Sequence, residues 1–221
     1  MYKKILNIIL VILIIAVIAA GGYLAYTYYD AHKKISDAEA FLDEEFDKLF
    51  IDISDETEEP TEPEETNTVP GQGTGYNYSN NNTIPLTYKG FPVAGKIEIP
   101  KTGIRYPILQ ETSSAKAIEY SIVKIYGPEL NKPGNVVLAG HNNNNSLFFG
   151  KNKNLQIGDK IYITDMTGKK LEYTIYKKYY TPGDDYSYVT RETNGAIEVT
   201  LYTCDATGAN RLIICARAEN E

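Results

Sequence analysis

Tryptophan is absent from the 221 residues of this chain, and cysteine and histidine occur only twice each. Cys204, Cys215, His32 and His141 are too few to form a four-ligand zinc site unless carboxylates join them. Basic residues are also scarce, because 22 lysines and arginines stand against 29 acids and the formal net charge is −7. A surface with this balance is poorly suited to binding phosphates, so the composition argues against nucleic acid as a partner.

The abundant residues favour strands and turns over long helices. The chain has 19 tyrosines, 17 glycines and 10 prolines, and aromatic residues are common in strands while glycine and proline are common in turns. The length allows one ordinary domain with accessory segments, or two small domains. We therefore expect a mainly β protein.

The N-terminal region predicts a membrane helix. Residues 1–4 contain Lys3 and Lys4, and the run 5–26 is apolar, uncharged and interrupted only by Asn7. At 1.5 Å per residue this run is about 30 Å long, enough to span a bilayer. A cleaved signal peptide is the alternative, but the apolar region of such a peptide is only about 7–15 residues long. An uncleaved anchor is favoured, with a cytoplasmic N-terminus and everything after the anchor outside the cell.

Two segments of different character follow the apolar run. Residues 27–51 carry apolar residues at a spacing near 3.6, which predicts a juxtamembrane amphipathic helix. Residues 52–83 are rich in acids, Pro, Gly and Asn and show no apolar periodicity. Such a stretch cannot bury enough surface to offset its ordering entropy, so a flexible acidic linker is expected.

The remainder, residues 84–221, is long enough for one buried core. Runs of β-branched and aromatic residues recur between turn signals, and a hairpin turn is expected at residues 165–168. Short helices are expected at residues 113–120 and 144–149. Seven or eight strands in this length favour a closed or nearly closed barrel with mostly antiparallel pairing. The predicted strands are residues 95–99, 105–109, 135–139, 160–164, 171–180, 196–203 and 211–216.

The predicted strands end at residues that can carry chemistry. Cys204 follows the strand 196–203, Arg211 opens the next strand after a six-residue loop, and His141 follows the strand 135–139. A thiol whose anion is supported by a neighbouring guanidinium is a plausible nucleophile. In one barrel the three side chains would meet at one rim, although spacing alone does not show this.

These motifs together resemble the sortase family. Residues 200–204 read TLYTC and resemble the family's TLxTC signature, Arg211 matches the arginine that follows it, and residues 140–142 read GHN and resemble the segment around the family's histidine. Further matches lie at residues 99–104, 107–108, 147–149 and 158–161, in the family's order. The resemblance covers about residues 95–218, and the N-terminal anchor agrees with it.

The resemblance implies a cysteine transpeptidase on an eight-stranded β-barrel, which anchors proteins to the envelope of Gram-positive bacteria. Cys204 would attack the Thr carbonyl of an LPxTG-like sorting signal and form a thioacyl enzyme. His141 would protonate the leaving glycine amine and then activate the incoming amine, and Arg211 would support the substrate or the oxyanion. The implied partners are surface proteins with such a signal and an amine acceptor such as lipid II or a peptidoglycan cross-bridge. No cofactor is implied.

Other interpretations of the site residues stay open. Cys204 and Cys215 could form a structural disulfide, although Cys215 lies in an apolar run that is typical of a core. Arg211 could pair with Asp205 or Glu198 at the surface.

Thr203 and the loop after residue 180 are further candidates. By the resemblance, Thr203 lines the peptide groove. Asp184 and Asp185 could bind substrate, or calcium as in some class A sortases, but no calcium ligand can be matched residue by residue.

The subclass and the function also have alternatives. The short connection between residues 180 and 196 departs from class B, so a class A or class D-like enzyme is expected. An L,D-transpeptidase would carry Cys and Arg almost adjacent after a Ser-x-Gly pattern, which residues 200–211 lack. A non-catalytic, tethered β-module for scaffolding or adhesion is the other alternative.

Overall fold

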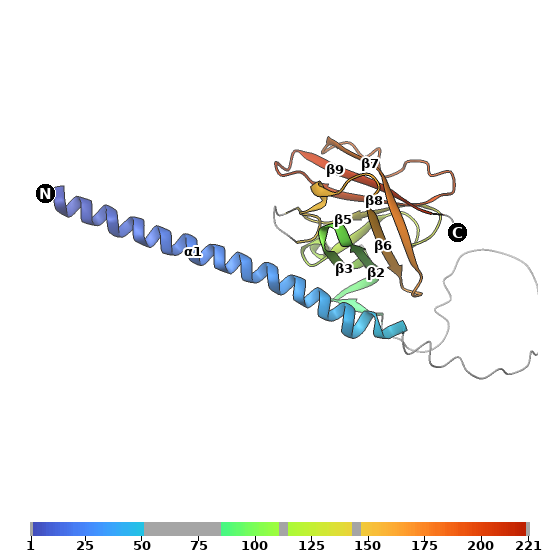
Figure 1. Ribbon diagram of the computed structural model, residues 1–221, viewed down its shortest axis with the longest axis horizontal. Coiled ribbons are helices and arrows are strands. Elements are labelled where there is room, and N and C mark those ends of the chain that lie inside the picture. The colour runs from blue at the N-terminus through green and yellow to red at the C-terminus, as the bar shows by residue number, and fades with distance from the viewer. Residues whose placement is uncertain (1, 51–84, 111–114, 143–146, 220–221) are drawn as a thin grey trace, which may run out of the picture.

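The computed structural model describes residues 2–50, 85–110, 115–142 and 147–219 (Figure 1). The predicted acidic linker, residues 52–83, lies outside the described residues. The described chain consists of one long helix and a β-barrel that lies against the C-terminal part of this helix.

The N-terminal helix α1, Tyr2–Phe41, is continuous and passes into a π-helical turn, η1, Leu42–Phe46. The structure therefore has no break between the predicted anchor at 5–26 and the predicted juxtamembrane helix. All side chains of the apolar run are exposed, and α1 with its extension to Phe50 is long and apolar enough to cross a membrane. A helix that is apolar on all sides needs an apolar surrounding, which the barrel does not supply here.

Nine strands form one sheet in the order β1-β2-β3-β4-β5-β8-β9-β7-β6. An additional pairing between β2 and β6 closes the sheet, so β2 to β9 make an eight-stranded barrel and β1 extends its edge. Most pairs are antiparallel, whereas β3–β4 and β5–β8 are parallel. The strands are β1 Thr87–Tyr88, β2 Phe91–Ile99, β3 Ile104–Gln110, β4 Ile122–Tyr126, β5 Gly134–Ala139, β6 Lys160–Asp165, β7 Lys170–Pro182, β8 Ile197–Cys204 and β9 Asn210–Ala218.

The barrel and its seven predicted strands are confirmed, but the smaller elements differ in part. Strand β4 was not predicted, and the helix expected at 113–120 is a 3₁₀ helix, η3, Ala115–Glu119. Residues 147–151 form a bend and turns, so the helix expected at 144–149 is wrong for residues 147–149; residues 143–146 are outside the described chain. Two further 3₁₀ turns are η2 Pro100–Thr102 and η4 Asn152–Asn154. The hairpin turn between β6 and β7 is present, with Gly168 at φ +82°.

The strand directions give the barrel two distinct rims. The ends of β2, β5, β7 and β8 lie together with the starts of β3, β4, β6 and β9, and this Cys204 rim contains both Cys204 and Arg211. The opposite edge contains the β1–β2 turn and the β6–β7 turn, and we call it the hairpin rim. Chemistry-bearing residues from distant parts of the sequence therefore meet at the Cys204 rim.

Candidate active site

His141 and Cys204 come together because β5 and β8 are parallel neighbours. Ala139 pairs with Tyr202 in this ladder, so the chain beyond each strand continues with His141 on one side and Cys204 on the other. The amide of Gly140 donates a hydrogen bond to the Tyr202 carbonyl at 3.2 Å, which extends the pairing past the last registered residues. The parallel ladder thus brings the two residues to the same rim, which the spacing in the sequence alone could not show.

Two side-chain hydrogen bonds join the histidine segment to the cysteine strand. The Thr203 hydroxyl donates to the Gly140 carbonyl at 2.7 Å, and the Asn142 amide donates to the Cys204 carbonyl at 2.8 Å. Thr203 is only 2% exposed, so in this structure it is a connection between strands. Its predicted role in lining a peptide groove stays a prediction.

Arg211 lies directly opposite Cys204. The two residues pair in the antiparallel ladder of β8 and β9, where opposite residues have Cβ atoms about 4.5–5.5 Å apart and side chains on one face. Arg211 Nε donates to the Tyr202 hydroxyl at 2.8 Å, and Nη1 donates to the carbonyls of Gly208 at 2.8 Å and Asn210 at 3.1 Å. These bonds fix the guanidinium near Tyr202, whose side chain shares a strand face with Cys204.

The electrostatics of Arg211 reflect the same neighbours. Partial burial acts to lower its pKa, but the hydrogen bond to Tyr202 and the negative charge that Tyr202 and Cys204 carry when ionised raise it overall. The guanidinium is therefore a permanent positive charge within electrostatic reach of Cys204, and it can stabilise negative charge on the thiol or on a substrate oxygen.

The loop between Cys204 and Arg211 has its own cap. The Asp205 carboxylate accepts hydrogen bonds from the Thr207 amide at 3.0 Å, the Thr207 hydroxyl at 2.8 Å and the Asn210 side chain at 3.0 Å. These bonds, that from the Thr207 hydroxyl first, lower the pKa of Asp205 to about 2. Asp205 is thus occupied in shaping the loop.

Sequence reasoning missed two neighbours of the predicted residues. His141 Nε2 lies 3.1 Å from the carboxylate of Glu119, at the end of η3. The side chains are 33% and 65% exposed, so solvent reaches this pair. Tyr202 is the second neighbour, and its ring stacks on Tyr188 with centroids 5.5 Å apart and planes 19° apart. Because side chains alternate along a strand, Tyr202 shares the face of Cys204, and that period was readable from the sequence.

The disulfide alternative is wrong. Cys204 and Cys215 are both free, and Cys215 pairs with Thr200, four positions along β8 from Cys204. Four positions correspond to about 13 Å, whereas bridged cysteines have Cα atoms less than about 7 Å apart. Cys215 is 1% exposed, and burial raises the pKa of its thiol. Cys215 therefore behaves as a small apolar core residue, as the favoured interpretation expected.

The surface ion-pair alternative for Arg211 is also not found among the described residues. Asp205 caps its own loop, and Glu198 pairs instead with Arg191 and Arg217. In the part of the chain that the structure describes, no group of three or more His, Cys, Asp or Glu side chains is placed to hold a metal ion. Asp185 accepts hydrogen bonds from the Thr181 hydroxyl and from the Ser187 amide, the latter at 2.8 Å.

The closed β-barrel brings Cys204, His141 and Arg211 to one rim, an arrangement suited to acyl transfer by a cysteine nucleophile. The comparison with protein families agrees, because residues 97–219 match the model of the sortase domain, which is more than half of the chain. The chain therefore belongs to the sortase family, whose members are cysteine transpeptidases.

Solved structures support the same conclusion. Sortase A from Corynebacterium diphtheriae, in a lid-mutant form, is 25% identical with a TM-score of 0.53, covering 59% of this chain and 72% of that one. A Clostridium perfringens sortase D5 transpeptidase is 26% identical with a TM-score of 0.52, covering 58% and 80%. C. perfringens sortase C with the C-terminal cell wall sorting motif has 24% identity and a TM-score of 0.52, covering 58% and 71%, and supports the fold. These relatives belong to classes A, D and C, so the similarity does not distinguish a subclass. A search of curated protein sequences found no match.

Proposed function

We propose that this protein is a membrane-anchored sortase that cleaves an LPxTG-like sorting signal and transfers the released acyl group to an amine of the cell envelope. The observation that carries the proposal is the placement of Arg211 directly opposite Cys204, with His141 joined to the same strand end. A nucleophile, a proton carrier and a fixed positive charge are the parts that acyl transfer requires.

The first half-reaction is acylation of Cys204. The thiolate sulfur attacks the Thr carbonyl carbon of the signal, and the carbonyl oxygen becomes an oxyanion. As the C–N bond to Gly breaks, the imidazolium of His141 gives its proton to the leaving amine nitrogen. A thioester between Cys204 and the substrate remains, with neutral imidazole beside it.

The second half-reaction reverses these roles. An acceptor amine attacks the thioester carbon, His141 takes the amine proton, and the C–S bond breaks to release Cys204 as a thiolate. The product is a new amide between the surface protein and its acceptor. Lipid II and a peptidoglycan cross-bridge both offer such an amine.

Arg211 stabilises the oxyanion in both half-reactions. Its Nε and Nη1 already donate to protein oxygens, whereas Nη2 has no hydrogen-bond partner among the described residues. Nη2 is therefore the donor available to the substrate carbonyl, and the other two bonds hold it in place before the substrate arrives.

The proposed membrane topology follows from the N-terminal sequence. Residues 1–4 lie in the cytoplasm, residues 5–26 of α1 span the membrane once, and the barrel lies outside the cell. The exposed apolar side chains of α1 support this arrangement, and Lys3 and Lys4 on the short N-terminal side favour the orientation.

The test is intact mass spectrometry of the full chain in detergent with a library of LPxTG-like peptides. We expect a peptide-acyl adduct on Cys204 that is absent from Cys204→Ala and disappears when an amine is added. Cys215→Ala is the matched control and should form the same adduct. An intact fold without an adduct for any peptide would contradict the proposal and favour the scaffolding alternative, and an adduct on Cys215 would overturn the site.

A further inference from the structure

The proposed membrane helix is continuous with the helical segment that packs against the barrel. Four tyrosines, Tyr23, Tyr26, Tyr28 and Tyr29, are 66–75% exposed near the end of the apolar run, where tyrosines mark a membrane–water interface. From Tyr26 the helix continues without a break to Phe41. Only 11 residues, about 16 Å of helix, separate Tyr26 from Asp37, which pairs with Lys89 of the barrel.

The contact between the helix and the barrel is buried. Ala38, Leu42 and Phe46 are 0% exposed and belong to the same hydrophobic core cluster as the barrel interior. Phe41 is 6% exposed and packs on Tyr88, with ring centroids 4.9 Å apart. A core shared in this way leaves little freedom for the barrel to move relative to the helix.

Ion pairs with defined partners set the orientation of the barrel on the helix. The Asp37 carboxylate lies 2.8 Å from Lys89 Nζ, and Asp47 lies 2.6 Å from Lys96 Nζ and 2.9 Å from Arg105 Nη2. The Lys96 side chain is only 9% exposed, so loss of Asp47 would leave its ammonium group with little water around it. Apolar packing alone would allow the barrel to sit on the helix in several orientations, whereas these ion pairs form in only one of them.

Two turns of the hairpin rim contact the helix. Lys89 lies in the β1–β2 turn, and Gly168 of the β6–β7 turn is so close to Phe50 that a Cβ atom there would lie 2.8 Å from the Phe50 ring. Both turns belong to the hairpin rim, and Phe50 lies farther from the membrane span than any other described helical residue. The contact also extends along β2 and β3, because Arg105 near the start of β3 pairs with Asp43 and Asp47. Cys204 and Arg211 lie on β8 and β9, which are across the barrel from β2.

From the hairpin rim to the Cys204 rim, strands β8 and β9 extend toward the side of the barrel on which the membrane span lies. In Figure 1 the C-terminal end of β9 lies on the side away from the N-terminus of α1, so the start of β9, with Arg211, lies on the side of the N-terminal half of α1. The eight residues of β8, which end at Cys204, extend about 26 Å. That length is greater than the roughly 16 Å of helix between Tyr26 and the first ion pair.

We infer that α1 holds the barrel against the outer surface of the membrane with the Cys204 rim directed toward the lipid headgroups. The partner of this rim is the lipid surface. The inference rests on the proposed anchoring of α1.

Depth-dependent quenching tests the orientation without using activity. The full chain with Cys204→Ala is placed in phosphatidylcholine–phosphatidylglycerol vesicles and labelled with a fluorophore at Ala206→Cys, in the exposed loop of the Cys204 rim. The matched control is Lys169→Cys, in the exposed turn of the hairpin rim. Cys215 is buried and leaves the introduced thiol as the labelling site. A spin label attached to lipid headgroups should quench the Ala206 site severalfold more strongly than the Lys169 site.

The other outcomes overturn different parts of the proposal. Equal quenching, or stronger quenching at residue 169, would overturn the orientation while leaving the anchor and the catalytic proposal intact. Failure of the chain to float with the vesicles would overturn the anchor, and the orientation with it.

A second variant separates orientation from anchoring. Leu42→Ala with Phe46→Ala weakens the shared core, so it should reduce the difference in quenching between the two sites while the protein still floats. Glu44→Ala, at an exposed position on the same turn, should keep the difference. An unchanged difference in the double variant would contradict the role of the helix contact.

Discussion

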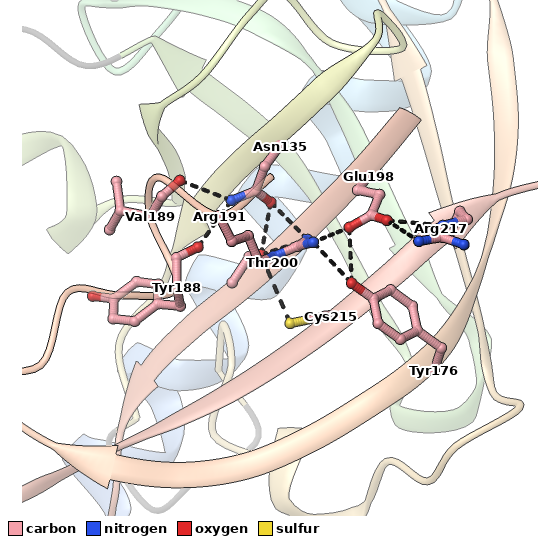
Figure 2. A network of polar contacts seen from close by, with 9 residues as sticks. All are labelled: Asn135, Tyr176, Tyr188, Val189, Arg191, Glu198, Thr200, Cys215 and Arg217. Atoms are coloured by element: carbon pink, nitrogen blue, oxygen red, sulfur yellow. Dashed lines mark hydrogen bonds and ion pairs between the residues drawn. The ribbon is translucent and has the colours of Figure 1, made fainter. Parts of the chain in front are cut away.

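The two ends of the β8–β9 pair use arginine in opposite ways. At the Cys204 end, Arg211 faces a thiol, and its Nη2 has no hydrogen-bond partner among the described residues. At the other end, Glu198 is fully buried between Arg191 and Arg217, and its carboxylate is saturated with donors (Figure 2). One end satisfies its charges within the protein, and the other leaves a charge for the substrate.

The Glu198 end is a closed network. Glu198 accepts hydrogen bonds from Tyr176 at 2.8 Å, from Arg217 Nε at 2.8 Å and from Arg191 Nη1 (Figure 2). Burial acts to raise the pKa of Glu198, but the hydrogen bonds from Arg191, Tyr176 and Arg217 outweigh it, so the pKa is lowered overall. The carboxylate therefore stays charged and bound at neutral pH.

The network at the Glu198 end also contacts the loop that reaches the Cys204 end. Asn135 accepts from Arg191 Nη2 at 2.9 Å and donates to the carbonyls of Tyr188 and Val189, which fixes the loop between β7 and β8 (Figure 2). The same loop presents the Tyr188 ring that stacks on Tyr202, and Tyr202 holds Arg211. The saturated network therefore holds the loop whose Tyr188 ring packs on Tyr202, the hydrogen-bond partner of Arg211.

The largest expected effect is at Arg211. Arg211→Lys keeps the charge but removes the fork of donors, so kcat/KM for transpeptidation should fall about 100- to 1000-fold, as for loss of an oxyanion donor. Steady-state kinetics with a fluorogenic sorting-signal peptide measures this loss. The urea midpoint should change little, and a large loss of stability without loss of activity would reverse the roles assigned to the two ends.

The next effect is at Glu198. Glu198→Gln removes the anion between two arginines and should lower the free energy of unfolding by about 3 kcal/mol, the lower end of the range for breaking a buried ion pair. Urea denaturation followed by circular dichroism measures it. Glu192→Gln, at an exposed position in the loop between β7 and β8, is the control and should change the free energy of unfolding by less than about 0.5 kcal/mol.

A smaller effect is expected at Tyr202. Tyr202→Phe keeps the stacked ring but removes the acceptor for Arg211 Nε, so kcat should fall about tenfold, as for a net hydrogen bond to a charged group of about 1.5 kcal/mol. In the background of Arg211→Ala the same substitution should have no further effect. Tyr188→Phe, which preserves the stack, is the control, and additive losses would show that Tyr202 does not act through Arg211.

The smallest effect concerns pH and Asp205. Because the pKa of Asp205 is lowered to about 2 in the folded protein, its stabilisation of the loop is present above the pKa of about 3.9 of an unfolded aspartate and is lost as pH falls toward 2. Amide exchange of residues 206–210 measured between pH 5 and pH 2 should show the loop opening first. Asp205→Asn should remove that pH dependence, and an unchanged profile would contradict the cap.

Much of this architecture follows from local pattern. The seven long strands, and the positions of Cys204, His141 and Arg211 at strand ends, can be read from β-branched runs and turn residues. Strand β4 was missed because it is only five residues long and is joined to its antiparallel partner β5 by residues 127–133, which are too many for a tight two-residue hairpin turn. The exposed partner of His141 had no sequence signal either, because Glu119 is 22 residues away.

The long-range polar contacts could not be predicted for a related reason. Asp47 and Arg105 are 58 residues apart, and only the folded barrel brings them together. The amphipathic period of residues 27–51 correctly indicated an apolar face, but not that the face completes the core of the barrel. Periodicity shows which face of a helix is apolar and must be buried, whereas tertiary packing decides which surface buries it.

Because Cys215 is buried, its reaction with a thiol reagent reports whether the barrel is folded. The Cys204 thiol is partly exposed, whereas the Cys215 thiol is enclosed by Val137, Tyr188 and Ile213. An alkylating reagent should therefore modify one cysteine in each native molecule. A second modification per chain registers the molecules whose barrel has opened, so a single mass spectrum reports both the occupancy of the reactive thiol and the fraction of the population that remains native.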